Sequence, residues 1–122
     1  MERRHTKLGV WQDAMQLVAA VYELCNQLPN EEKFGLISQM QRAAVSIPSN
    51  IAEGAARESD REFLRYLYIA RGSLAELETQ ILISEKLKFI THSVSLNELT
   101  NCVFAKLAAL INKLKRDTGV GV

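Results

Sequence analysis

The side chains best suited to chemistry gather in one central segment, RAAVSIPSNIAEG at residues 42–54. If this segment is an α-helix, with about 100° of rotation per residue, polar side chains form a narrow row opposite its isoleucines. The row contains amides, a hydroxyl and both charges, but no lysine. We call this set the polar stripe: Gln39, Arg42, Ser46, Asn50, Glu53 and Arg57.

Two interpretations of the polar stripe are open. It is either a solvent-facing surface with i,i+4 pairs such as Glu53 with Arg57, or a contact with a second subunit or a ligand. Arginine suits the contact, because its planar guanidinium matches carboxylates and phosphates at interfaces. Gly54, among alanines, would let another helix come close.

A second polar row is predicted on the following helix, at Ser73, Glu76 and Gln80. We expect it to face Asn50 and Glu53, inside one subunit or across a subunit boundary. A carboxylate pair from the two rows would suggest a di-metal site, but such bundle sites need Glu-x-x-His motifs, which neither histidine supplies. We therefore predict no metal and no cofactor.

The remaining reactive residues predict no enzyme. Cys25 and Cys102 form no metal motif and fall on apolar helical faces, so we expect buried, reduced thiols. The sequence has no nucleophile paired with a base and no phosphate-cradling glycine loop.

Basic side chains form three clusters that could bind phosphate, although each could equally be a solvated run. Tyr66 and Tyr68 offer no obvious stacking platform for bases, and with Arg65 they could instead form an intersubunit contact. The net charge is only +1, which gives no global attraction to nucleic acid. The clusters are Arg3, Arg4 and Lys7; Arg57, Arg61 and Arg65; and Lys113, Lys115 and Arg116.

Helices must position these residues, because apolar side chains recur at alternating threes and fours along the chain. The pattern predicts a single domain, residues 1–122, with helices at about 8–28, 33–57, 60–88 and 95–116. Short connections, above all between the first three helices, favour an all-α, antiparallel up-and-down four-helix bundle. Either Ser59 or Asp60 can cap the third helix, and we favour Asp60 because Phe63 begins the next apolar row. Ser95, with Glu98 in a capping box, is the expected cap of the fourth helix.

Pro48 interrupts the second predicted helix, at a cost of about 3 kcal/mol in a helix interior. Either this helix ends near Ile47 and a turn follows, or it kinks and continues. The apolar positions Ala44, Ile47 and Ile51 stay in phase across the proline. We therefore favour a continuous helix kinked at Pro48.

No apolar run of about eighteen residues is present, so we expect no membrane span. The N-terminal sequence lacks the apolar centre of a signal peptide. Both observations predict a cytoplasmic protein.

The stretches VWQDAMQLVAAVYEL, FGLISQMQRAAVSIPSNIAEG and YIARGSLAELETQ resemble a known family. It is the family of four-helix-bundle proteins first described from open reading frames inside intervening sequences of bacterial large-subunit ribosomal RNA. The resemblance runs from about Leu8 to about Ile90. Its most specific block is the run from Gln39 to Gly54, and the Gly72, Ser73, Glu76 group with Gln80 also fits.

The resemblance implies a left-handed bundle that assembles into homo-oligomeric barrels, typically pentamers. The related accessory proteins of diversity-generating retroelements bind nucleic acid and a reverse transcriptase through a basic surface, and no enzymatic activity comes with the family. We therefore expect a non-enzymatic oligomer that binds RNA or DNA. The alternatives are a scaffold for a protein partner, such as a reverse transcriptase, and a purely structural oligomer. The near-neutral charge departs from the basic barrel that the resemblance implies.

Overall fold

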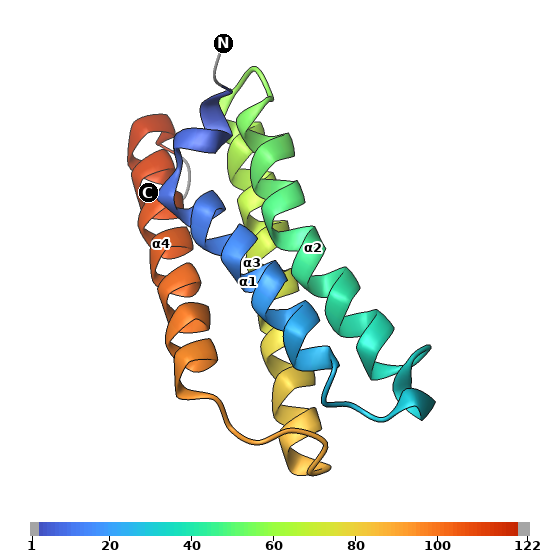
Figure 1. The fold of residues 1–122 in the computed structure, drawn as a ribbon. Helices are drawn as coiled ribbons and strands as arrows, with labels where there is room; N and C mark the ends of the chain where they lie inside the picture. Colours follow the sequence, from blue (N-terminus) through green and yellow to red (C-terminus); the bar gives the residue numbers. More distant parts are fainter. Residues whose placement is uncertain (1–2, 120–122) are drawn as a thin grey trace.

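The computed structural model describes residues 3–119, which form helices and no strand. Four long helices are joined by short segments that include two 3-10 turns, η1 and η2 (Figure 1). This confirms the predicted all-helical, four-helix fold. The elements are η1 (Arg4–Lys7), α1 (Gly9–Cys25), η2 (Asn30–Glu32), α2 (Leu36–Ala55), α3 (Asp60–Lys86) and α4 (Val94–Thr118).

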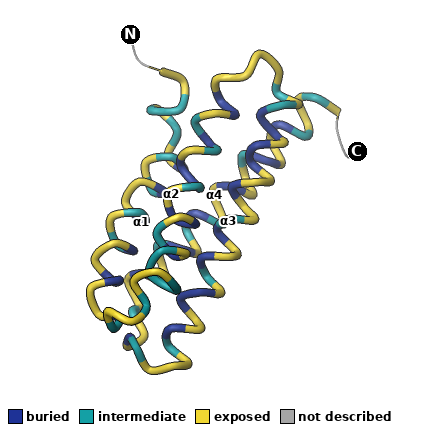
Figure 2. The backbone as a smooth tube through the Cα atoms, turned by 90° about the vertical axis from the view of Figure 1, so that its right-hand side faces the viewer, coloured by how far each residue is buried: buried dark blue, intermediate teal, exposed yellow. Residues whose placement is uncertain are grey.

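The four helices surround one apolar core. α1 packs against α2 and α4, and α3 packs against the same two helices. Each helix turns a buried row inward, so that buried residues recur between exposed ones along its length (Figure 2). The core includes Leu17, Met40, Ile47, Phe63, Leu74, Leu77, Leu107 and Ile111, all at most 1% exposed.

The three connections lie at alternate ends of the bundle (Figure 1). The segments that join α1 to α2 and α3 to α4 lie at one end. The segment between α2 and α3 lies at the other end, beside η1. The connection between α2 and α3 is as short as predicted, whereas residues 26–35 form a longer one that contains η2. The expectation of a short first connection, with a helix from about 33, is therefore wrong.

Both predicted helix caps are displaced. Ser59, in an extended conformation, caps α3 by accepting a 3.2 Å hydrogen bond from the Glu62 amide, and Asp60 is already helical. Ser93 caps α4 in the same way, with the Leu96 amide at 3.2 Å. In both cases the hydroxyl that lies three residues before a free amide is the one that can reach it.

Pro48 lies inside one uninterrupted helix, Leu36–Ala55, and is itself buried. The alternative in which the second helix ends near Ile47 is therefore wrong. Ala44, Ile47 and Ile51 are all fully buried, as their common phase predicts. The apolar row that continues past the proline therefore keeps both halves of α2 against the core.

α4 is the one described helix whose length and apolarity would let it cross a membrane, with a mean hydropathy of 1.3 in its most apolar window. This is weak evidence for a span, because core helices of soluble proteins share these properties. α4 also turns Val103, Leu107 and Ile111 into the core. The expectation of no membrane span stays a prediction.

Candidate functional site

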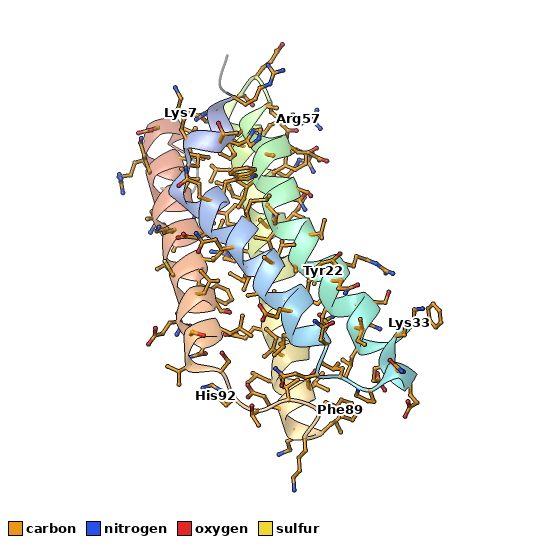
Figure 3. The ribbon with its side chains drawn as sticks, viewed as in Figure 1. Lys7, Tyr22, Lys33, Arg57, Phe89 and His92 are labelled. Carbon is orange, nitrogen blue, oxygen red and sulfur yellow. The ribbon has the colours of Figure 1, made fainter. Side chains whose placement is uncertain are left out.

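Two of the three basic clusters meet at the junction between α2 and α3. η1 packs against α1 and α2, which brings the N-terminal arm to this junction. There, Arg4 Nη2 lies 3.6 Å from Asp60 Oδ1, and its guanidinium lies 4.9 Å from the centre of the Phe63 ring. Lys7 and Arg57 accordingly appear at the same end of the bundle (Figure 3).

The third cluster, at the end of α4, lies beside the other two. Lys113 borders the same shallow groove as Leu8 and Gly9, at the start of α1. Lys115 Nζ lies 5.8 Å from the centre of the Tyr68 ring on α3. All nine predicted basic residues thus lie in one region, which we call the basic end: residues 3–7, 53–65 and 113–118.

Charge is strongly separated along the bundle. The basic end carries nine Lys and Arg side chains against five Asp and Glu. The opposite half, residues 23–36 and 76–98, carries three basic side chains against seven acidic ones, and we call it the acidic half. The net charge of +1 therefore conceals a bundle that is positive at one end and negative at the other.

Aromatic rings hold several of the arginines in place. The guanidinium carbons of Arg57 and Arg65 lie 5.0 and 4.6 Å from the centre of the Tyr66 ring, and Arg57 also donates to the Tyr66 hydroxyl. Arg65 binds the Glu62 carboxylate through Nε at 3.1 Å and Nη2 at 3.2 Å. This pairing lowers the pKa of Glu62 and raises that of Arg65.

Other cations at this end are free. Arg61, Lys113 and Arg116 are exposed, and none of them forms an ion pair within residues 3–119. The basic end therefore combines fixed arginines with uncommitted positive charges, an arrangement suited to a polyanion.

The polar stripe meets the second polar row inside one chain, through Ser46 rather than through the expected Asn50 and Glu53. The hydroxyl oxygens of Ser46 and Ser73 lie 2.8 Å apart across the boundary between α2 and α3. Asn50 Nδ2 donates back to the carbonyl oxygen of Ser46 at 2.7 Å and to its hydroxyl at 2.9 Å. Gln80 donates to Glu76 at 3.1 Å, within α3.

Side chains toward the ends of the polar stripe are exposed and do not join these hydrogen bonds. Glu53 does not pair with Arg57, because Arg57 turns to Tyr66. Gln39, Arg42 and Glu53 are exposed, and their side chains have no partner within the described residues. The Oε1 atom of Gln80 is buried and accepts no hydrogen bond there. The stripe is therefore an internal seam at its centre and an open surface at its edges.

A profile for a protein family matches residues 6–113 of the chain, and the family is described as 23S rRNA-intervening sequence protein. The chain belongs to this family. A search of curated proteins finds no match. The family match spans the polar stripe and includes Lys7, Arg57, Arg61, Arg65 and Lys113. The other four residues of the basic end, Arg3, Arg4, Lys115 and Arg116, lie outside it.

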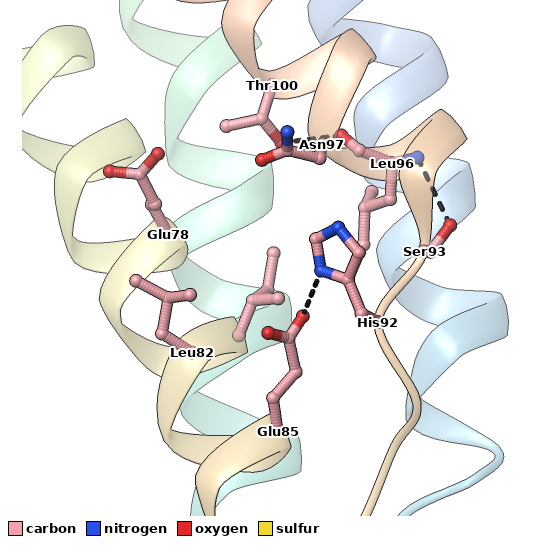
Figure 4. A pocket seen from close by; sticks show the side chains of 9 residues that line it. Glu78, Leu82, Glu85, His92, Ser93, Leu96, Asn97 and Thr100 are labelled. Carbon is pink, nitrogen blue, oxygen red and sulfur yellow. Dashed lines mark hydrogen bonds and ion pairs between the residues drawn. The ribbon is translucent and has the colours of Figure 1, made fainter.

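This intervening-sequence protein also has a small pocket between α3 and α4, in its acidic half (Figure 4). Its walls are Ile81, Leu82 and Leu96, and its rim carries Glu78 and Glu85. His92 Nδ1 lies 3.2 Å from Glu85 Oε2. Across the described part of the chain, no three His, Cys, Asp or Glu side chains are grouped as metal ligands would be.

The two cysteines differ in burial and in their contacts. Cys25 is buried, as predicted, and burial raises the pKa of its thiol. Cys102 is half-buried and donates to Asp13 Oδ2 at 3.4 Å, so the prediction of a buried thiol on an apolar face is wrong for it. The same carboxylate oxygen lies 2.6 Å from Lys106 Nζ, which lowers the pKa of Asp13.

Proposed function

We propose that this family member is a non-enzymatic homo-oligomer that binds nucleic acid through its basic end. The observation that carries the proposal is the meeting of three basic clusters from three separate segments on one surface. Phosphate contacts by Lys and Arg supply most of the affinity of sequence-independent nucleic-acid binding. A ring of subunits would present this surface once per subunit.

Assembly into a ring, with the pentamer that the resemblance implies, is supported by two different apolar surfaces. One is the groove between α1 and α2, where Met15 and Val45 are 46% and 41% exposed beside Trp11 and Pro48. The other follows α3, where Ile69 and Ile83 are 42% and 41% exposed. Two unlike surfaces on one subunit suit head-to-tail contacts, which form a ring when the rotation between subunits closes.

We also infer that the bundle is the antiparallel, up-and-down and left-handed form, with α2 bent at Pro48. The alternate ends of the three connections support the up-and-down order. Proline removes a helical hydrogen bond and presses on the preceding turn, which supports the bend. We expect the protein to act in the cytoplasm and outside membranes.

The test is fluorescence anisotropy with structured RNA, single-stranded RNA and duplex DNA over a series of salt concentrations. The protein is held at a concentration that preserves its oligomer. We expect affinity to fall steeply with salt, with a log–log slope of about −0.9 per neutralised phosphate of duplex.

A matched pair of triple variants shows whether the basic end is responsible. Lys113→Gln, Lys115→Gln and Arg116→Gln remove three charges from the basic end, and the slope should become less steep by roughly 0.9 for each duplex phosphate that is no longer neutralised. Lys33→Gln, Lys86→Gln and Lys88→Gln remove three charges from the opposite half and should change the slope little. Equal effects of the two sets, or no binding at low salt, would overturn the proposal.

A second function is favoured by the exposed apolar residues of the acidic half. Phe34, Leu87 and Val94 are 89%, 53% and 64% exposed. They suit a scaffold that binds a protein partner, such as a reverse transcriptase, without a nucleic-acid role. Capture of such a partner that survives the Lys113, Lys115 and Arg116 substitutions, together with no binding of nucleic acid, would favour this function.

A further inference from the structure

Aromatic side chains at the basic end are already occupied by cations. Phe63 is fully buried beneath Arg4, and Tyr66 is only 8% exposed, with Arg57 and Arg65 over its ring. Single-stranded nucleic acids gain about 1–3 kcal/mol for each base that stacks on an open aromatic ring. Neither of these rings is open to a base.

The aromatic rings next to this surface are no better placed. Tyr68 is 36% exposed, but Arg71 and Lys115 lie 4.9 and 5.8 Å from its centre. Trp11 is half-buried, with the His5 ring edge-on to it at 5.1 Å. Of the two most exposed aromatic residues, Phe34 lies in the acidic half, and Tyr22 lies on α1 outside the basic end. Within the described residues, the basic end thus offers cations and no free stacking platform.

We infer that the basic end recognises the phosphate backbone of double-stranded nucleic acid, without contacts to the bases, in preference to single strands. This inference rests on the proposed function and names its substrate class. A duplex carries the higher density of phosphate charge, and a bound cation therefore releases more counterions from it. The salt slopes are about 0.9 per contact for duplex DNA and 0.7 for single strands.

The preference has a measurable size. For about six phosphate contacts, those slopes predict that the duplex gains about 15-fold over a single strand for each tenfold dilution of salt. RNA and DNA duplexes share the backbone chemistry, and separate duplexes of each kind show whether the groove shape of one is favoured.

The experiment compares four fluorescent probes of equal length on the full chain: duplex RNA, duplex DNA, single-stranded DNA, and an abasic single strand with the same backbone. We expect either duplex to bind more tightly than the single strands, with a ratio that widens on dilution of salt. The abasic strand should bind within about twofold of the strand that carries bases, because stacking contributes nothing.

Tyr68→Leu is the direct test of stacking on the most exposed aromatic ring next to the basic end. It should leave the ratio of duplex to single-strand affinity unchanged, even if both affinities shift together. A single strand that binds more tightly than both duplexes, a marked loss of affinity for the abasic strand, or a selective loss of single-strand binding in Tyr68→Leu would overturn the inference while the proposed function stands. No binding of any probe would overturn both.

Discussion

Gly54 faces α3 at a point where no side chain fits. A Cβ atom at this position would lie 2.7 Å from Tyr66 Cβ and 2.9 Å from Phe63 Cδ1. The glycine therefore sets the approach of α2 to the two aromatic residues that carry Arg4, Arg57 and Arg65. Glycine inside a helix costs about 1 kcal/mol relative to alanine. At Gly54 this cost is explained by the close packing of α3, which leaves no room for a side chain.

Gly54→Ala should therefore destabilise the fold by about 1–3 kcal/mol, because overpacking outweighs the gain in helix propensity. Gly72→Ala is the matched control. No atom lies within 4 Å of a Cβ built at Gly72, so this variant should gain about 0.5–1 kcal/mol. Denaturant unfolding of both variants measures the difference. A stable Gly54→Ala variant would show that α3 can move aside, and a loss of oligomer in Gly72→Ala would indicate a second chain packed against α3.

Cys102 should respond to the charge of Asp13. The carboxylate accepts its S–H bond and raises the pKa of the thiol. Asp13→Asn removes that negative charge, so more thiolate forms at a given pH and alkylation of Cys102 should become several-fold faster. Mass spectrometry of the alkylated peptide separates Cys102 from Cys25. Glu23→Gln, an exposed change on the same helix, is the control, and an unchanged rate in Asp13→Asn would contradict the contact.

The contact between Asp13 and Lys106 predicts a pH dependence of stability. Lys106 lowers the pKa of folded Asp13 below its ordinary value of 3.8, through the hydrogen bond between them. The stabilisation is therefore present above that ordinary value and is lost as pH falls through the lower folded value. The difference in unfolding free energy between the wild type and Asp13→Asn should vanish in strong acid. A difference that persists there would show that the effect of the substitution is not electrostatic.

At the scale of helices, apolar periodicity was sufficient to predict the number of helices and the course of α2 through Pro48. The caps and the first connection were harder. Ser59 and Asp60 are adjacent and both can cap a helix, and only the extended backbone at Ser59 decides between them. Residues 30–32 form a 3-10 turn that ordinary helix periodicity does not distinguish from the start of a helix.

The meeting of the basic clusters could have been predicted from the expected connections. In a bundle whose connections alternate between the ends, both termini and the middle connection share one end. The three basic clusters occupy those three places. The contacts of Arg57 with Tyr66 and of Cys102 with Asp13 could not have been found, because they depend on rotamers that spacing does not specify.

The proposed bend in α2 gives a prediction at this scale. Spin labels at Gln39→Cys and Ala56→Cys, both exposed positions, report the distance between the ends of α2 after Cys25 and Cys102 are replaced by serine. Pro48→Ala restores the missing amide and removes the ring that presses on Ala44, so the helix should straighten and the distance should lengthen. Ser49→Ala, one residue along, is the control. An unchanged distance in Pro48→Ala would mean that packing, not the proline, sets the shape of α2.

At the scale of the whole molecule, the proposed assembly would strengthen the proposed binding of nucleic acid. A single bundle with nine basic side chains at one end would neutralise only a few phosphates, while a ring would align several such ends on one face. The proposed nucleic-acid binding thus depends on the apolar groove between α1 and α2, which reaches the basic end only at His5.

Val45→Asp places a charge in that groove and should dissociate the oligomer into subunits of 13.7 kDa, because an unpaired carboxylate is costly to bury in an apolar contact. Light scattering coupled to size-exclusion chromatography gives the mass. Leu87→Asp introduces the same charge at a more exposed apolar residue in the acidic half and should leave the mass unchanged. If Val45→Asp keeps the wild-type mass, the groove is not the subunit contact. If it dissociates but still binds duplex with the wild-type affinity and salt slope, each bundle binds alone, and the link between assembly and nucleic-acid binding is wrong.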